Sequence, residues 1–216
     1  DFFAGQVQAN QQAIDAFVSS KEGLVWAMNN LSNSDKVFSW FSLVVINHWV
    51  CNNPTALPLQ QVQATLLPLI SSYLQKGNKG GATKVAVIYC AATRWTFSNG
   101  NVCGDIMALA RNDATVDAAI LLLSLAAEEF RSVPLKFHVP SQRIRQLQAA
   151  FEQQAGDVVS LLVSLVSTSH VEALAALSKY MGWVPTDTLV ACNVFALLDR
   201  TIPILAATKY SVDCLT

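Results

Sequence analysis

The residues most able to do chemistry in this sequence are acids and histidines, and their spacing argues against catalysis. Glu128 and Glu129 are adjacent. Neighbours on a helix point about 100° apart, so they cannot share a proton as paired catalytic carboxylates do. His170 lies near Ser169 and Glu172, but without the strand–turn–helix elbow that presents a nucleophilic serine. We therefore expect no enzymatic activity.

Metal, cofactor and redox chemistry have equally little support. The cysteines are far apart, with no CxxC pair and no Cys–His grouping at zinc-ligand spacing. We expect them to be buried free thiols of a reducing compartment. They are Cys51, Cys90, Cys103, Cys192 and Cys214. His48 has no second ligand at i+4, and no GxxxxGK[ST] phosphate loop occurs. We predict no cofactor and no metal.

Composition excludes further classes of function. The 216 residues are 52% hydrophobic and only 13% charged, with a net charge of −1. Soluble domains carry about 25% charged residues, so this chain is unusually apolar. Disorder is excluded, and so balanced a charge disfavours binding to nucleic acid. The uncharged stretch Val37–Gln75 is broken by prolines and amides, which argues against a membrane-spanning helix.

Helical periodicity runs through the whole chain, and strand signals are nearly absent. A flexible turn, Lys76–Gly81, separates two of the expected helices. The expected helices are Gln8–Val18, Glu22–Leu31, Asp35–Val50, Leu57–Gln75, Ala82–Arg94, Asn101–Ala110, Ala114–Phe130, Gln142–Ser167, Val171–Met181, Asp187–Arg200 and Ile202–Cys214. Short helices with short loops fit either a globular bundle or a stacked solenoid.

The spacing of aromatic residues at helix ends favours the solenoid. Trp49, Trp95, Phe130 and Trp183 each follow a long apolar run, at intervals of 46, 35 and 53 residues. The average of about 45 falls in the range of a two-helix HEAT repeat. Apolar helices alternate with helices richer in Gln, as stacked hairpins require. We predict an all-α fold: a right-handed α-solenoid of about five antiparallel helix pairs.

Two of the more polar helices offer exposed faces that a partner could contact. On Leu57–Gln75 the expected buried stripe is Leu59, Val62, Leu66, Leu69, Ile70 and Tyr73. The opposite side carries Gln61, Thr65, Pro68 and Ser72. On Gln142–Ser167 the expected exposed set is Arg143, Arg145, Gln146, Gln153 and Asp157. Arginines are favoured at interfaces for their planar fork of donors, although each of these residues equally suits an ordinary solvated surface.

Several segments, in order along the chain, resemble one family of helical proteins. The opening DFFAGQVQANQQAIDAFVSS, then SDKVFSWFSLVVINHWV, KVAVIYCAATRWTF, AAILLLSLAAEEF, SQRIRQLQAAFEQQAGDVVSLLVSLV and SKYMGWVPTDTLV resemble the amino-terminal repeats of exportins in the importin-β superfamily. The branch most similar carries actin–profilin complexes. Two features depart from the family pattern. Trp95-Thr96 stands where Trp-Pro is usual, and only Ser167-Thr168-Ser169 stands where many exportins have a long insertion.

The resemblance implies that residues 1–216 form an amino-terminal HEAT-repeat arch, an importin-β N-terminal or exportin-1-like region. It further implies a transport receptor that shuttles between nucleus and cytoplasm, binding the GTP form of Ran, protein cargo and nucleoporins, but neither nucleic acid nor membranes. GTP then belongs to Ran. The α-helical faces above become candidate Ran contacts. The alternatives are a helical-repeat scaffold or adaptor unrelated to Ran, and an importin of the same superfamily.

The ends of the sequence suggest a piece of a longer protein. The chain begins without an initiator Met and stops just after an apolar run. We expect an open apolar face there, formed by Ile204, Leu205, Val212 and Leu215. An open face of this kind leads us to expect self-association of the isolated chain.

Overall fold

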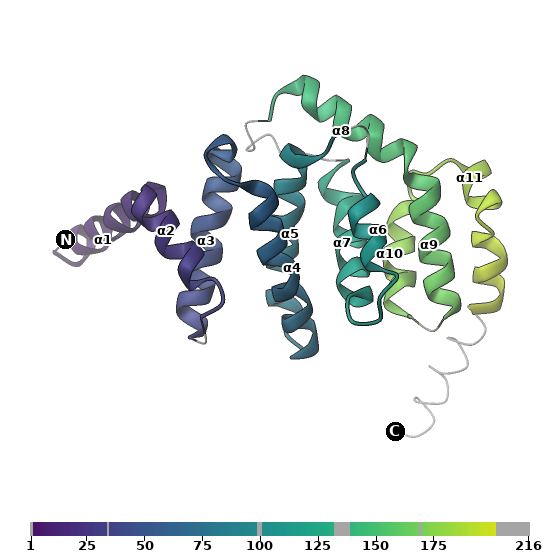
Figure 1. The fold of residues 1–216 in the computed structure, drawn as a ribbon, viewed down its shortest axis with the longest axis horizontal. Helices are drawn as coiled ribbons and strands as arrows, with labels where there is room; N and C mark the ends of the chain where they lie inside the picture. The colour runs from purple at the N-terminus through teal and green to yellow at the C-terminus, as the bar shows by residue number, and fades with distance from the viewer. Residues whose placement is uncertain (1, 34, 99–100, 132–138, 169, 202–216) are drawn as a thin grey trace. The chain divides into compact units, whose positions relative to one another are not determined.

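The computed structural model describes residues 2–33, 35–98, 101–131, 139–168 and 170–201, and this part of the chain is almost entirely helical (Figure 1). The expected apolar face at the carboxyl end, the helix predicted over 202–214 and Cys214 lie outside the described residues. None of the helices in the described ranges is long and apolar enough to cross a membrane.

Eleven α-helices and one 3-10 helix follow one another through the described residues, which include no strand. They are α1 (Phe2–Ser19), α2 (Lys21–Asn30), α3 (Lys36–Asn52), η1 (Pro54–Ala56), α4 (Leu59–Gln75), α5 (Lys79–Thr96), α6 (Gly104–Leu109), α7 (Val116–Glu129), α8 (Ser141–Gln153), α9 (Ala155–Ser167), α10 (Glu172–Met181) and α11 (Thr186–Ala191). The chain divides into two compact units: residues 1–97 with 133–144, and residues 98–132 with 145–216.

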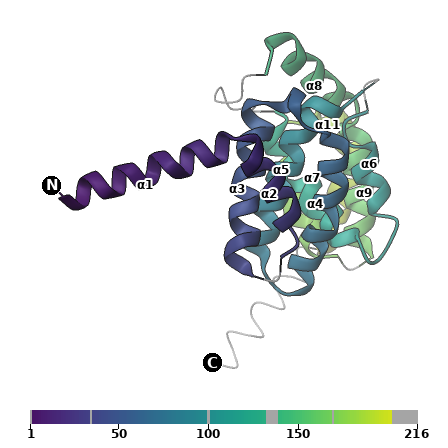
Figure 2. The same cartoon turned by 60° about the vertical axis from the view of Figure 1, so that its left-hand side comes forward.

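In the first unit, helices that follow one another in sequence pack in pairs. Helix α2 packs on α3, α4 packs on α5, and α3 also contacts α5. Residues 9–16 of α1 are exposed, and Figure 2 shows the helix extending away from the other helices of its unit. Its carboxyl end is held by buried Trp49, whose Nε1 donates to the carbonyl oxygen of Val18 at 2.9 Å. The end of α1 therefore has a partner for one of its unpaired carbonyls.

In the second unit, α7 packs against α6 and α10, and α10 packs against α9. Aromatic rings fill the space between these helices. The centroid of Phe151 lies 5.5 Å from that of Phe130 and 5.4 Å from that of Trp183. Fully buried Tyr180 donates its hydroxyl proton to the carbonyl oxygen of Leu123 at 2.8 Å. Such ring pairs stabilise a core beyond the area that they bury.

The fold is all-α and of the helical-repeat solenoid class, which confirms the predicted fold class. Successive helices form the pairs that HEAT-type repeats consist of. The handedness of the stacking and the number of repeats stay predictions. So does the assignment of residues 1–216 to one arch.

Two predicted helices are each broken, so those predictions were wrong in detail. The helix predicted over Gln142–Ser167 is α8 and α9, separated at Gln154. The side chain of Gln154 accepts from the backbone N–H groups of Val102 and Cys103 at 2.9 Å each, and donates to Asn101 Oδ1 at 3.1 Å. Gln154 lies in a turn between the two helices, and these bonds hold its side chain there.

The helix predicted over Asp187–Arg200 ends early, at Ala191. Asn193, in the turn that follows, has a φ of 58°, in the left-handed region. Asparagine tolerates this conformation better than most residues, and a continuous right-handed helix cannot contain it. The chain is helical again over 194–201.

The cysteines differ partly from expectation. Of the cysteines among the described residues, Cys90 and Cys103 are buried, as expected, whereas Cys51 and Cys192 are only half-buried. Burial raises the pKa of the Cys103 thiol from 9.0 to about 12. The folded protein therefore keeps this thiol protonated at pH values where the unfolded chain releases the proton.

We predict a measurable pH dependence from Cys103. Its pKa is higher in the folded state, so its contribution to stability is complete below pH 9 and is lost between pH 9 and about 12. The free energy of unfolding should fall with pH more steeply in the wild type than in Cys103→Ala, by up to about 1.4 kcal/mol per pH unit. Denaturant titrations of both proteins at several pH values above 9 measure this difference. The contributions of the other titrating groups are the same in both proteins and cancel when the two are compared. Parallel slopes would contradict it.

Candidate partner-binding surface on helix α4

Helix α4 shows the two-sided pattern that the sequence predicts. Val62, Leu66 and Ile70 are completely buried. Leu59, Leu69 and Tyr73, also expected in the buried stripe, are only half-buried. The pairing of α4 with α5 is reinforced by Gln63, whose Nε2 donates to Thr93 Oγ1 at 2.8 Å.

The structure brings four of the predicted contact residues together on the other side of α4. Gln61 and Pro68 are exposed, while Thr65 and Ser72 are half-buried. The Thr65 hydroxyl donates to the carbonyl oxygen of Gln61 at 2.9 Å, within the same stripe. This surface, which we call the α4 face, is polar and uncharged. It can offer amide and hydroxyl hydrogen bonds to a partner but no salt bridge.

Pro68 gives the α4 face an unusual backbone acceptor. Proline has no backbone N–H, so the helical bond that would normally reach the carbonyl of Ala64 cannot form. Ala64 is itself exposed. A carbonyl without its helical partner on an exposed face remains available to water or to a donor from a partner.

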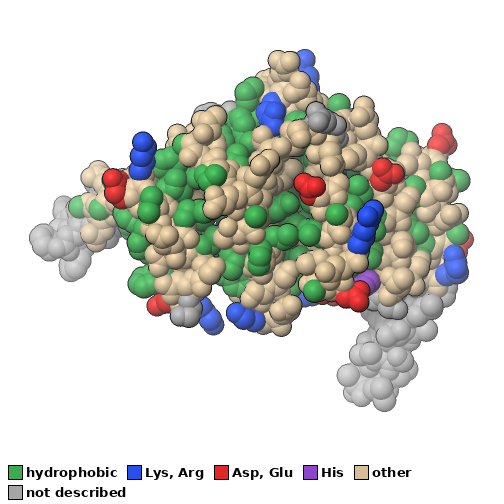
Figure 3. Space-filling model, in the orientation of Figure 1, with side chains coloured by type: hydrophobic (Ala, Val, Ile, Leu, Met, Phe, Trp, Pro, Cys, Tyr) green, Lys and Arg blue, Asp and Glu red, His purple; other side chains and the backbone are tan. Residues whose placement is uncertain are grey.

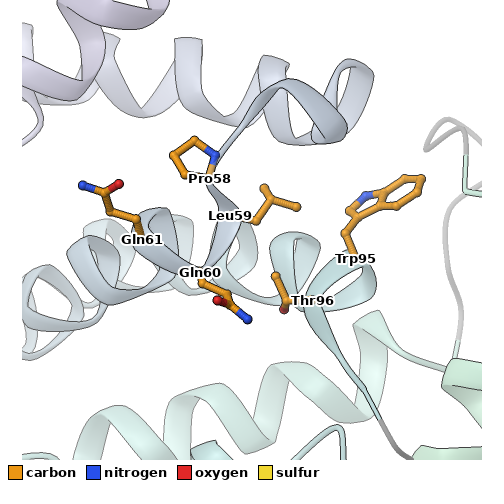
Figure 4. Close-up of a pocket in the computed structure, with 6 residues that line it drawn as sticks. All are labelled: Pro58, Leu59, Gln60, Gln61, Trp95 and Thr96. Atoms are coloured by element: carbon orange, nitrogen blue, oxygen red, sulfur yellow. The ribbon is translucent and has the colours of Figure 1, made fainter.

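An open pocket lies at the amino end of the α4 face (Figure 4). Its volume is about 440 Å³, and it is lined by Pro58, Leu59, Gln60, Gln61, Trp95 and Thr96. Pro58 caps α4, the next three residues start it, and the last two end α5. Sequence reasoning did not find this pocket, because its two sides are more than thirty positions apart along the chain.

Arg143 holds the end of α5 next to this pocket. Its Nε donates to the carbonyl oxygen of Arg94 at 2.7 Å, and its Nη2 donates to those of Trp95 at 2.6 Å and Phe97 at 3.3 Å. The guanidinium carbon lies 4.4 Å from the centre of the Phe97 ring. Partial burial lowers the pKa of Arg143 from its ordinary value. The side chain thus caps a helix carboxyl end, where a cation is favoured.

The other predicted contacts on α8 have different surroundings. Arg145 and Gln146 are exposed and belong to the second unit, whereas Arg143 belongs to the first. Gln153 and Asp157 are exposed, as expected. The role of these residues and of the α4 face in binding a partner stays a prediction. For Arg143 a partner would have to share a guanidinium that already donates to three carbonyls.

The residues first considered for chemistry make ordinary structural contacts. Glu128 Oε1 lies 2.8 Å from Lys179 Nζ. His170 Nδ1 lies 3.9 Å from Asp117 Oδ1. His48 Nε2 lies 3.3 Å from Ser19 Oγ. Within the described ranges, no group of three or more His, Cys, Asp or Glu side chains is placed to hold a metal ion.

Comparison with known protein families assigns the chain to one of them. Paired helices define a helical-repeat protein. The family model described as exportin 1-like protein matches residues 82–215, which is more than half of the chain. The chain belongs to this family, and so to the importin-β superfamily of nuclear transport receptors. Among curated proteins, none matches the chain.

We predict that Arg143 stabilises the fold through its cap. Arg143→Met keeps the apolar stem but removes the three donated hydrogen bonds, and should lower the free energy of unfolding by about 1 to 3 kcal/mol. The matched control is Arg145→Met, two residues away and exposed, which should change stability by less than about 0.5 kcal/mol. Urea unfolding followed by circular dichroism measures both. Equal effects would show that the cap contributes nothing.

Proposed function

We propose that this protein is a nuclear export receptor that binds the GTP form of Ran together with protein cargo. The observation that carries the proposal is membership of the exportin 1-like family over residues 82–215. A helical-repeat protein in this role needs no catalytic group of its own, because its partner hydrolyses the nucleotide. We accordingly propose no enzymatic activity for it.

The α4 face is our candidate for the Ran contact. Helix α4 precedes residues 82–215, so its role rests on its exposed polar side chains and the adjoining pocket, not on the family match. Arg145 and Gln146 lie within the matched residues and add exposed donors. An uncharged face suits a partner recognised by shape and hydrogen bonding, with specificity gained from correctly paired amides.

Cargo identity and transport direction are finer parts of the same proposal. The resemblance to the actin–profilin branch makes an actin–profilin complex the first cargo to test. In an export receptor, cargo and the GTP form of Ran raise each other's affinity, because coupling between two binding sites is reciprocal. In an importin the coupling has the opposite sign. We also propose contacts with nucleoporins and shuttling between nucleus and cytoplasm.

The test is binding of purified Ran to the whole chain. Immobilised protein should retain Ran loaded with a non-hydrolysable GTP analogue at least about tenfold more tightly than Ran loaded with GDP, a difference of about 1.4 kcal/mol. Biolayer interferometry measures both affinities. Equal retention of the two forms, or of neither, would overturn the proposal in favour of a scaffold unrelated to Ran.

Substitutions locate the contact. Gln61→Arg places a bulky cation on the α4 face and should weaken binding of the GTP form about tenfold by desolvating an unpaired charge. The matched control is Gln12→Arg on exposed α1, which should leave affinity unchanged. If both variants bind as the wild type does, the Ran contact lies elsewhere. Adding actin–profilin should tighten Ran binding; weaker binding would indicate an importin.

A further inference from the structure

Helix α3 carries an apolar stripe that stays exposed among the residues that the structure describes. Val37, Trp40 and Val44 follow one another at i, i+3 and i+7, so they share one side of the helix. Their exposed fractions are 71%, 43% and 38%. We call these three residues the α3 stripe. The other side of the helix is buried in the first unit through Leu43, Ile46 and Val50 among others.

Exposure of this kind is unusual for the residues concerned. Single exposed apolar side chains are common, but contiguous exposed patches mark interaction sites in soluble proteins. Tryptophan is the residue most enriched among those that dominate binding energy. Lys84 of α5 places its Nζ 3.7 Å from the centre of the Trp40 ring, a cation–π contact that favours this orientation of the ring. A rigid aromatic anchor loses little entropy on binding.

Basic residues outnumber acidic ones around the α3 stripe, where Asp35 is the acid next to Lys36. Residues 36–104, which include all of α3, α4 and α5, contain no Asp or Glu but five Lys and Arg. Figure 3 shows one face of the molecule, on which charged side chains are few and scattered among apolar and uncharged polar ones. Asp35, just before the stripe, caps α3: its Oδ1 accepts from the N–H of Val37 at 2.7 Å. Exposed Lys36 and Lys84 therefore border the stripe without a competing acid on these helices.

We propose that the α3 stripe and Lys84 form a docking site for an acidic amphipathic helix of a partner protein. Anchors at i, i+3 and i+7 span two helical turns, about 10 Å, which is the spacing of apolar residues on the face of a docking helix. The carboxylates of the docked helix would be attracted by Lys84 and Lys36. This site is on α3 and α5, not on the α4 face, so it is independent of the proposed contact with Ran.

The chemistry argues against other occupants. A phosphate backbone needs clustered Arg and Lys, whereas this surface alternates cations with exposed apolar side chains. A peptide of basic amphipathic character would be repelled by Lys36 and Lys84, and Asp35 would offset only part of this repulsion. The Lys84–Trp40 pair can contact both kinds of group on an acidic amphipathic ligand. The ring can pack against an apolar side chain, and the ammonium can pair with a carboxylate.

A designed peptide tests the site on the whole chain. The probe is a fluorescent helical peptide of roughly 15 residues with Leu at i, i+3 and i+7 and Glu at flanking positions. We expect anisotropy titrations to give a Kd on the order of 10 to 100 μM, weakening as salt is raised. The same peptide with Lys for every Glu, and one with Ala for every Leu, should each bind at least about tenfold more weakly.

Variants tie binding to the named residues. Trp40→Ala should weaken the acidic peptide about tenfold, and Lys84→Gln about threefold with a smaller dependence on salt. Val190→Ala removes a comparably exposed apolar side chain, 58% exposed, from α11 and should have no effect. Thermal unfolding and binding of the GTP form of Ran should be unchanged in Trp40→Ala, which separates this site from the proposed function.

Three results would overturn the proposal. Equal binding of the Glu and Lys peptides would show that charge plays no part. Unchanged binding by Trp40→Ala would place the peptide elsewhere. A concentration-dependent dimer of the wild type that Trp40→Ala abolishes, measured by sedimentation velocity, would show that a second copy of the chain covers the stripe.

Discussion

The burial of apolar helices on several sides is the constraint on which the rest of this structure depends. From Val85 to Arg94 nearly every side chain of α5 is buried, and α7 is buried almost as completely. A single partner helix can cover only one stripe of another helix. Both helices therefore need neighbours from more than one pair, and packing of α5 on both α4 and α3 meets this need. Stacked helix pairs follow from the composition: an apolar, weakly charged chain must have such helices somewhere.

Burying helices this way creates a second demand, because helix ends leave carbonyls unpaired. The protein meets it with side chains from distant segments: Arg143 pairs carbonyls at the end of α5, and Trp49 pairs one at the end of α1. Gln154 does the complementary task before α6, where its side-chain oxygen accepts from the N–H groups of Val102 and Cys103. The polar residues of this chain that carry most structural weight are thus those at helix ends, not those on helix faces.

This division explains what the sequence could predict. The buried side of α4 was predicted from periodicity alone, since a period of 3.6 is a local property, and so was the all-α class. The break between α8 and α9 was not, because Gln154 acts on Val102 and Cys103, about fifty positions earlier. Arg143 was predicted to be an exposed surface residue, because the carbonyls that it caps also lie nearly fifty positions earlier in the chain. The neighbouring sequence does not distinguish an arginine that caps a remote helix from one that is exposed and binds another protein.

The distribution of charge shows why averages over the whole chain mislead. The net charge of −1 combines a first unit with eight basic and four acidic residues and a second unit with six basic and eleven acidic ones. The argument against nucleic acid, made from the average, must therefore be repeated for the first unit. It still holds there, because the exposed cations are dispersed among apolar side chains such as Trp40, and counterion release needs phosphate contacts in number. What this surface offers instead is two lysines beside an exposed tryptophan ring, a combination that suits polypeptides with acids and apolar residues on the same side.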